Sequence, residues 1–92
     1  MLGKRIRELR EKSGHTVREF AELLGKSPGY ISRIEARGEI PSPELLCKIA
    51  EILRGDVDEL LRFAKESQLA RVEKDIDEKH ASALTLFRKR KR

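Results

Sequence analysis

The segment TVREFAELLGKSPGYISRIEARG, residues 16–38, carries side chains whose types and spacing suit hydrogen bonding to the edges of nucleic-acid bases. Arg33 can make a bidentate contact to guanine, because its planar guanidinium presents paired N–H donors. Ser27 and Ser32 each offer a hydroxyl that donates or accepts, so they discriminate weakly between bases. The two residues after Ser27 offer no side-chain hydrogen bond. We therefore predict base contacts from Ser27, Ser32 and Arg33, with Arg33 as the main source of specificity.

Other side chains around this segment are candidates for contacts with phosphate, which position a protein on DNA without reading its sequence. Tyr30 has two further interpretations, contact with a thymine methyl group or partial burial against the preceding helix. Each cation has the simpler interpretation of a solvated surface charge. The candidates for backbone or flanking contacts are Lys4, Arg5, Val17, Arg18, Lys26, Tyr30 and Arg37.

Four small or apolar residues in the segment have the spacing of two helices that cross steeply. Counted from Val17, Ala21 is fifth, Gly25 ninth, Ile31 fifteenth and Ile34 eighteenth. A small residue is needed at the crossing, and a tight turn needs a positive φ, which glycine adopts without strain. The two isoleucines would anchor the second helix, so that its other face points outward. This spacing predicts a DNA-reading helical hairpin.

Apolar periodicity and capping signals predict that the chain is all-helical. Thr16 and Glu19 form a capping box, and Gly14 suits a left-handed helix end. Ser27 and Ser42 each precede a proline, which is favourable at the first position of a helix. No alternating apolar run suggests a strand before Ala83, and we find no internal repeat. The expected helices cover about residues 2–12, 16–24, 27–37, 42–54 and 56–67.

The motifs GKRIRELREKSG, TVREFAELLGKSPGYISRIE and PSPELLCKIAEIL, followed by DVDELL, resemble the helix-turn-helix proteins of the phage Cro and phage repressor type, the XRE family. The resemblance covers about residues 2–64. It implies a five-helix bundle that binds duplex DNA, usually as a dimer on a palindromic operator, to regulate transcription. It also implies a structural pair between Arg10 and Glu35. The alternative for that pair is two solvated surface charges.

Three features depart from the family pattern. Val17 stands where many members have a glutamine that contacts the DNA backbone, so that contact is absent or comes from the backbone amide. The glycine of EARG falls one residue late, which predicts a third helix longer by one residue. Pro28 and Gly29 occupy positions that often carry base-reading side chains. Gly29 either relaxes the first turn or lets the backbone approach the floor of the groove.

Charge along the sequence favours a polyanionic partner. The net charge of +5 is divided into +4 over residues 1–37, −4 over residues 38–87 and +5 over the final RKRKR. A local positive field attracts a polyanion more effectively than a dispersed charge does.

The other residue types exclude several classes of function. His15 and His80 lie far apart, and no Cys/His spacing suggests a metal. No nucleophile with a base, no paired acids and no glycine-rich phosphate loop suggests an enzyme or a cofactor. The single cysteine, Cys47, is expected to be a small packing residue and indicates a reducing compartment. The first residues lack a long apolar run, so we expect no signal peptide, no membrane span and a cytoplasmic location.

The residues that follow the predicted bundle carry an apolar stripe at nearly heptad spacing. Such a stripe either folds back on its own domain or pairs with a second copy, and we favour a dimer seam. The sequence LTLF is a weaker candidate for a short strand. His80 is interpreted as a packing residue. The stripe contains Leu69, Val72, Ile76, His80, Ala83 and Phe87.

Taken together, these patterns predict three segments and a function. Residues 1–65 form the helix-turn-helix domain, residues 66–87 an amphipathic helical extension that dimerises, and residues 88–92 a basic tail. The predicted function is a sequence-specific duplex-DNA-binding regulator, a repressor, acting as a homodimer. Two alternatives remain: an antitoxin-like binder of a protein partner that regulates its own promoter, and an RNA- or ribosome-associated adaptor.

Overall fold

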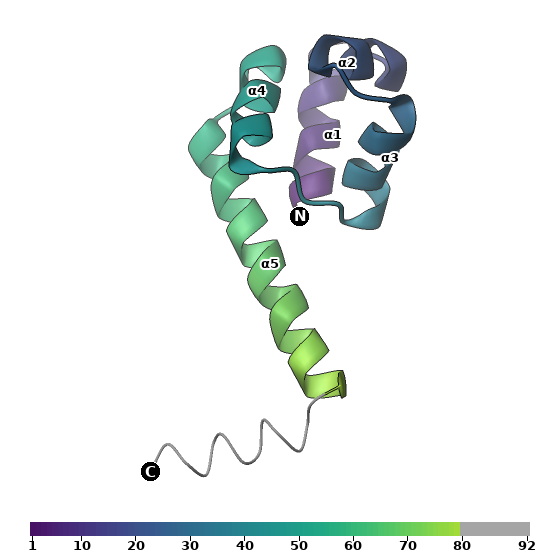
Figure 1. The fold of residues 1–92 in the computed structure, drawn as a ribbon. Coiled ribbons are helices and arrows are strands. Elements are labelled where there is room, and N and C mark those ends of the chain that lie inside the picture. The colour runs from purple at the N-terminus through teal and green to yellow at the C-terminus, as the bar shows by residue number, and fades with distance from the viewer. Residues whose placement is uncertain (80–92) are drawn as a thin grey trace.

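The computed structural model describes the backbone of residues 1–79 and the side chains of residues 1–72. Five helices follow one another in this part of the chain, and no strand occurs within it, as the sequence predicted. Figure 1 shows α1 between α3 on one side and α4 on the other, while α5 extends well beyond the bundle. The helices are α1 (Leu2–Lys12), α2 (Val17–Leu24), α3 (Pro28–Arg37), α4 (Pro43–Leu53) and α5 (Val57–Lys79).

Local signals in the sequence determine where the helices begin. The Thr16 hydroxyl accepts a hydrogen bond from the Glu19 amide, and the Glu19 carboxylate accepts one from the Thr16 amide, which confirms the capping box before α2. Ser27 and Ser42 cap α3 and α4 with their side-chain oxygens, and each of these helices has proline in its first turn. The capping signals therefore predicted these three helix starts correctly.

A left-handed residue lies at or just after the end of each of the first four helices. Gly14, Gly25 and Gly38 have φ values of 78°, 75° and 77°, a conformation that glycine adopts without steric penalty. Because Gly38 rather than the preceding residue ends α3, this helix extends through Arg37, as predicted. Arg54 ends α4 with a φ of 55°, without being a glycine.

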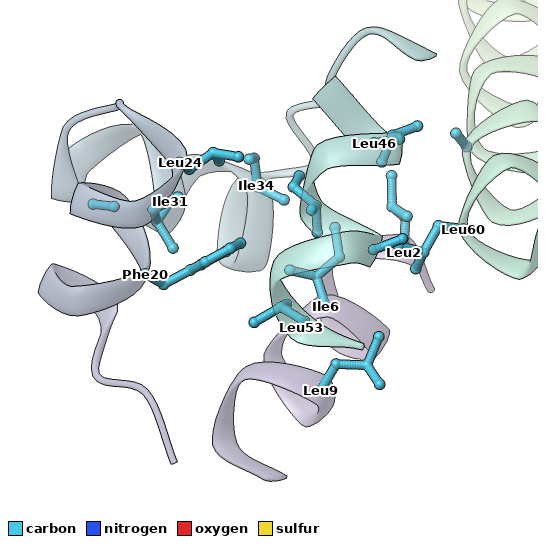
Figure 2. Packing of buried hydrophobic residues seen from close by; sticks show 14 residues of the cluster. Leu2, Ile6, Leu9, Phe20, Leu24, Ile31, Ile34, Leu46, Leu53 and Leu60 are labelled. Atoms are coloured by element: carbon cyan, nitrogen blue, oxygen red, sulfur yellow. The ribbon is translucent and has the colours of Figure 1, made fainter. Parts of the chain in front are cut away.

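The core lies where α1, α2, α3 and α4 meet, and the start of α5 closes it. Figure 2 shows Phe20 and Ile31 on one side, facing Ile6 of α1 and Leu53 of α4. Leu60 of α5 is also completely buried. Each helix thus contributes at least one apolar side chain to a single cluster.

Two small or apolar residues of the helices lie at the surface rather than in the core. Cys47 is exposed on α4, so the prediction that it is a small packing residue is wrong. Leu23 of α2 has 51% of its surface exposed. Both residues lie at the margin of an apolar stripe, where a rotation of the helix by a fraction of a turn decides between interior and solvent.

The extension does not form a separate helix up to the last described residue. The sequence predicted a helix over residues 56–67 and an extension from residue 66, but α5 continues without interruption through Lys79. No glycine or proline occurs between Gly55 and Lys79 to break the helix. His80, Ala83 and Phe87, and the candidate strand LTLF, lie outside the described residues.

In the described part of the chain, no helix is both long enough and apolar enough to cross a bilayer.

Candidate nucleic-acid interface

The α2–α3 pair forms the hairpin that the spacing predicted. Ala21 is only 1% exposed at the contact between helices, and Gly25 makes the left-handed turn after α2. Ile31 and Ile34 are buried. With these two side chains turned into the core, the opposite face of α3 is directed toward solvent.

A buried ion pair fixes α3 against α1. Arg10 Nε donates to Glu35 Oε2 at 2.8 Å, and Arg10 Nη2 donates to Glu35 Oε1 at 3.1 Å. Arg10 Nη1 also donates to the His15 carbonyl at 2.8 Å, which joins the pair to the turn before α2. The side chains are 10% and 7% exposed, so the predicted structural pair is present and is not a pair of solvated charges. The hydrogen bonds to Glu35 raise the pKa of Arg10.

Gly3 sets the approach of α1 to α3, a role that was not among the predictions from the sequence. A Cβ at Gly3 would collide with the carbonyl oxygen of Ile34 and would lie 2.9 Å from that of Glu35. Only glycine allows the N-terminal turn of α1 to lie this close to the backbone of α3. The signal in the sequence was a glycine inside a predicted helix, where it is unfavourable unless packing or function requires it.

The three predicted base-contacting residues all lie at the surface of the hairpin. Ser27 and Ser32 are exposed, and the side chain of Arg33 is 52% exposed. Ser27 Oγ accepts a hydrogen bond from the Tyr30 amide at 3.1 Å, so its oxygen is partly committed to capping α3. Ser32 and Arg33 therefore have the more available side-chain groups of the three.

Arg33 belongs to a surface cluster, called here the Arg33 cluster, that consists of Lys26, Tyr30, Arg33 and Glu39. The guanidinium carbon of Arg33 lies 5.4 Å from the centre of the Tyr30 ring, and Lys26 Nζ lies 5.7 Å from it. Arg33 Nε lies 3.7 Å from Glu39 Oε1. Glu39 was not among the predicted site residues.

Tyr30 is half-buried, which agrees with one of its three predicted interpretations. Partial burial raises the pKa of its phenol, the nearby Glu39 raises it further, and Arg33 opposes the shift. The phenol is consequently a neutral hydroxyl at physiological pH and can donate a hydrogen bond to a phosphate.

The predicted phosphate contacts divide into two groups. Lys4, Arg18, Lys26 and Arg37 are exposed, and Val17 is half-buried at the start of α2. Arg5 instead pairs with α5: its Nε lies 2.6 Å from Glu59 Oε1, and Nη1 lies 3.5 Å from Glu8 Oε2. These interactions, led by Glu59, raise the pKa of Arg5. In the free protein Arg5 therefore joins α1 to α5, and its contact with phosphate stays a prediction.

Within the part of the chain that the structure describes, no three histidine, cysteine, aspartate or glutamate side chains are grouped to hold a metal ion.

A helical pair joined by a glycine turn, with the second helix anchored by isoleucines and polar on its outer face, defines a helix-turn-helix domain. The helix-turn-helix family model matches residues 6–60, and the chain belongs to this family. The predicted resemblance to XRE-type proteins and the predicted all-helical fold are thereby confirmed.

Several regulators of transcription are related to the chain. It is 33% identical over 69 residues to the HTH-type transcriptional regulator SinR of Bacillus licheniformis, a match that covers 74% of this chain and 62% of SinR. The match to the transcriptional regulator ClgR of Mycobacterium tuberculosis has 34% identity and covers 77% of this chain and 68% of ClgR. The chain thus spans less than two thirds of the length of SinR. These relatives are named as regulators and not as enzymes, in agreement with the predicted absence of catalysis.

Two solved structures of SinR match the fold. SinR crystallised in complex with DNA has a TM-score of 0.60 and 35% identity, and the match covers 66% of this chain and 98% of that chain. A complex of the SinR and SinI proteins matches with a TM-score of 0.61 and 28% identity, covering 99% of this chain and 98% of that chain.

Proposed function

We propose that this protein binds duplex DNA through α3 and regulates transcription, acting as a repressor. The observation that carries the proposal is the outward face of α3, where Ser32 and Arg33 are exposed while Ile31 and Ile34 anchor the helix. An α-helix presented in this way fits the major groove, where base pairs display distinct donor and acceptor patterns. The similarity to SinR crystallised with DNA supports the proposal.

The exposed cations around α3 provide the affinity in this proposal. Lys26, Arg18 and Arg37 surround the hairpin, and Lys4 lies at the start of α1. Phosphate contacts release counterions, so log affinity falls by about 0.9 per neutralised phosphate for each unit of log salt concentration. A strong salt dependence is therefore expected, together with a specific component from Arg33.

The experiment that tests DNA reading combines selection and salt titration. Duplexes selected from a random pool should share a consensus with a guanine in each half-site. Lys26→Ala should weaken selected and random duplexes alike and reduce the salt slope by about one. A wild-type slope near zero, or a pool that yields no consensus, would remove the proposed function. Preference for RNA over duplex DNA would favour the RNA adaptor instead.

Dimerisation through the distal half of α5 is the second part of the proposal. Leu69 and Val72, in the distal half of α5, are 53% and 55% exposed. A groove of about 410 Å³ lies beside Val72, between α5 and the turn after α3, and Ile40 contributes to its wall. Burial of these side chains by a second copy would remove apolar surface from water. A two-fold dimer would present two copies of α3 to a palindromic operator.

The same apolar surface has a second candidate occupant, a different protein. The similarity over nearly the whole chain to SinR in its complex with SinI favours this alternative. A heterologous partner would compete with self-association, so the two interpretations differ in the mass of the purified species. If the purified protein has the mass of a homodimer, self-association is supported.

A further inference from the structure

The geometry of the Arg33 cluster points to positioning residues for the base reader. We propose that Glu39 and Tyr30 hold the guanidinium of Arg33 in one orientation, with its terminal Nη edge available to a guanine, and thereby increase the preference for a selected site over random DNA. The inference rests on the proposed function, because it assumes that Arg33 reaches a base.

The backbone at the end of α3 explains why Glu39 lies beside Arg33. Gly38 is left-handed, with a φ of 77°, and it reverses the chain so that the Glu39 amide donates to the Arg33 carbonyl at 3.1 Å. The Gly38 amide donates to the same carbonyl, so two amides after the helix end converge on Arg33. The glycine that falls one residue late in the sequence thus determines which residue of α3 faces Glu39.

The guanidinium of Arg33 lies close to the Glu39 carboxylate and to the Tyr30 ring. Its Nε lies 3.7 Å from Glu39 Oε1, and its central carbon lies 5.4 Å from the Tyr30 ring centre. The guanidinium has five N–H donors in a rigid plane, and Nε is its atom within ion-pair distance of the Glu39 carboxylate. The two Nη groups can still form parallel hydrogen bonds, which is the arrangement that recognises O6 and N7 of guanine.

Tyr30 is the aromatic residue of the Arg33 cluster, and it is a neighbour of Arg33 along α3. It lies three residues before Arg33 on the same helix, where side chains are adjacent. It is half-buried against the core, so its ring is held more firmly than an exposed side chain would be. A fixed aromatic ring beneath a guanidinium reduces the number of orientations that Arg33 samples before binding.

The charge of Glu39 affects the complex with random DNA differently from the complex with a selected site. A carboxylate beside the reader repels the phosphates that Arg33 would otherwise contact on random DNA. On a selected site the Nη edge binds guanine while the ion pair to Nε persists. Glu39 therefore disfavours phosphate contacts of Arg33 and leaves the base contact intact. It thereby raises the ratio of the affinity for a selected site to the affinity for random DNA.

A double-mutant cycle between Arg33 and Glu39 tests this inference. Wild type, Glu39→Gln, Arg33→Ala and the double variant are titrated with the selected duplex and with a random duplex of equal length, at one salt concentration. Glutamine keeps the Glu39 backbone hydrogen bond and nearly the same shape. Glu39→Gln should tighten binding to random DNA and lower the selected-to-random ratio about two- to fivefold, the range that an exposed ion pair supports. Tyr30→Leu should lower the ratio in the same direction.

The control and the double variant separate positioning from general charge. Glu22 is an exposed carboxylate on α2, so Glu22→Gln removes the same charge from the hairpin without contacting Arg33. It should tighten both duplexes equally and leave the ratio unchanged. In the Arg33→Ala background, Glu39→Gln should behave like the control. A fall in the ratio that persists there would overturn the inference.

Two further outcomes are distinguishable from one another. If Glu39→Gln shifts both duplexes equally in the wild-type background, Glu39 contributes only its charge, and the inference fails while the proposed function stands. If wild type itself shows no selected-to-random preference, the proposed function fails as well.

Discussion

Gly29 and Gly3 both lie inside helices, but their surroundings differ completely. A Cβ at Gly29 would have Ser27 Oγ as its neighbour, at an ordinary 3.8 Å, whereas a Cβ at Gly3 would meet two carbonyl oxygens of α3. The fold therefore requires glycine at Gly3 and has space for a side chain at Gly29. Space at the start of α3 is consistent with a close approach by DNA.

Gly29→Ala is expected to stabilise the free protein and weaken DNA binding. Alanine is favoured over glycine in a helix by about 1 kcal/mol, and nothing in the surroundings of Gly29 offsets that gain. The added methyl group would point away from the core and separate α3 from the groove. Denaturant unfolding and duplex titration measure the two effects. Unchanged DNA affinity with higher stability would show that Gly29 only relaxes the first turn.

Gly3→Ala should have the opposite effect on stability. The new methyl group would force α1 away from the backbone of α3, and overpacking of this kind costs about 1–3 kcal/mol. Unfolding in urea measures the loss, with Gly29→Ala as the matched control. A Gly3→Ala variant as stable as the wild type would mean that α1 moves without cost.

The contact between α1 and α3 depends on the buried ion pair as well as on Gly3. Arg10→Met would leave the Glu35 carboxylate, which is 7% exposed, without its partner. Breaking a buried pair on one side costs about 3–5 kcal/mol. Arg7→Met is the control, because the Arg7–Glu11 pair is exposed and should be worth less than about 1 kcal/mol. Equal effects of the two substitutions in urea unfolding would contradict this assignment.

The capping box of α2 should make stability depend on pH. Hydrogen bonds from Thr16, led by that of its backbone amide, lower the pKa of Glu19 below the ordinary value of 4.5. A lowered pKa in the folded state gives a contribution that is complete above about pH 6 and is lost as the pH falls through the folded value. The stability difference between wild type and Glu19→Gln should therefore shrink from pH 6 to pH 3. A difference independent of pH would exclude the charged cap.

The helix boundaries were predictable from the sequence because capping and turn signals act over only a few residues. The cap before α2, the glycine after it and the proline starts of α3 and α4 each depend on neighbours within one turn. The Arg10–Glu35 pair followed from the family resemblance and not from local pattern. Contacts between distant segments were not predictable in this way: the Arg5–Glu59 pair joins residues 54 positions apart.

The Arg33–Glu39 contact was missed for a different reason. Its partners are close in sequence, but the contact depends on the left-handed Gly38 that reverses the chain after α3. A helical projection assumes that the helix continues, so it gives the wrong direction for side chains beyond the helix end. The site could therefore be predicted along α3 itself, but not at the turn that follows it.

At the scale of the whole molecule, the distal half of α5 connects the proposed dimer seam to the reading helix. Arg71 Nη1 donates to the Gly38 carbonyl at 3.2 Å, so α5 contacts the turn that ends α3. The groove beside this contact is lined by Glu39 as well as by Val72. A second copy on this surface would thus lie next to the Arg33 cluster, which would couple self-association to the arrangement of the reader.

Leu69→Glu is expected to convert a homodimer into folded monomers. Leu69 is 53% exposed in the single chain, so a glutamate there would leave the fold intact but would place a charge in the proposed seam. Sedimentation should show half the wild-type mass with unchanged helicity, and affinity for a palindromic duplex should fall more than affinity for a single half-site. Ala70→Glu is the matched control: Ala70 is also exposed, but it lies about 100° around α5 from Leu69, away from the stripe. A wild type that sediments as a monomer at tens of micromolar, or a Leu69→Glu variant that stays dimeric, would show that a second copy does not cover this surface.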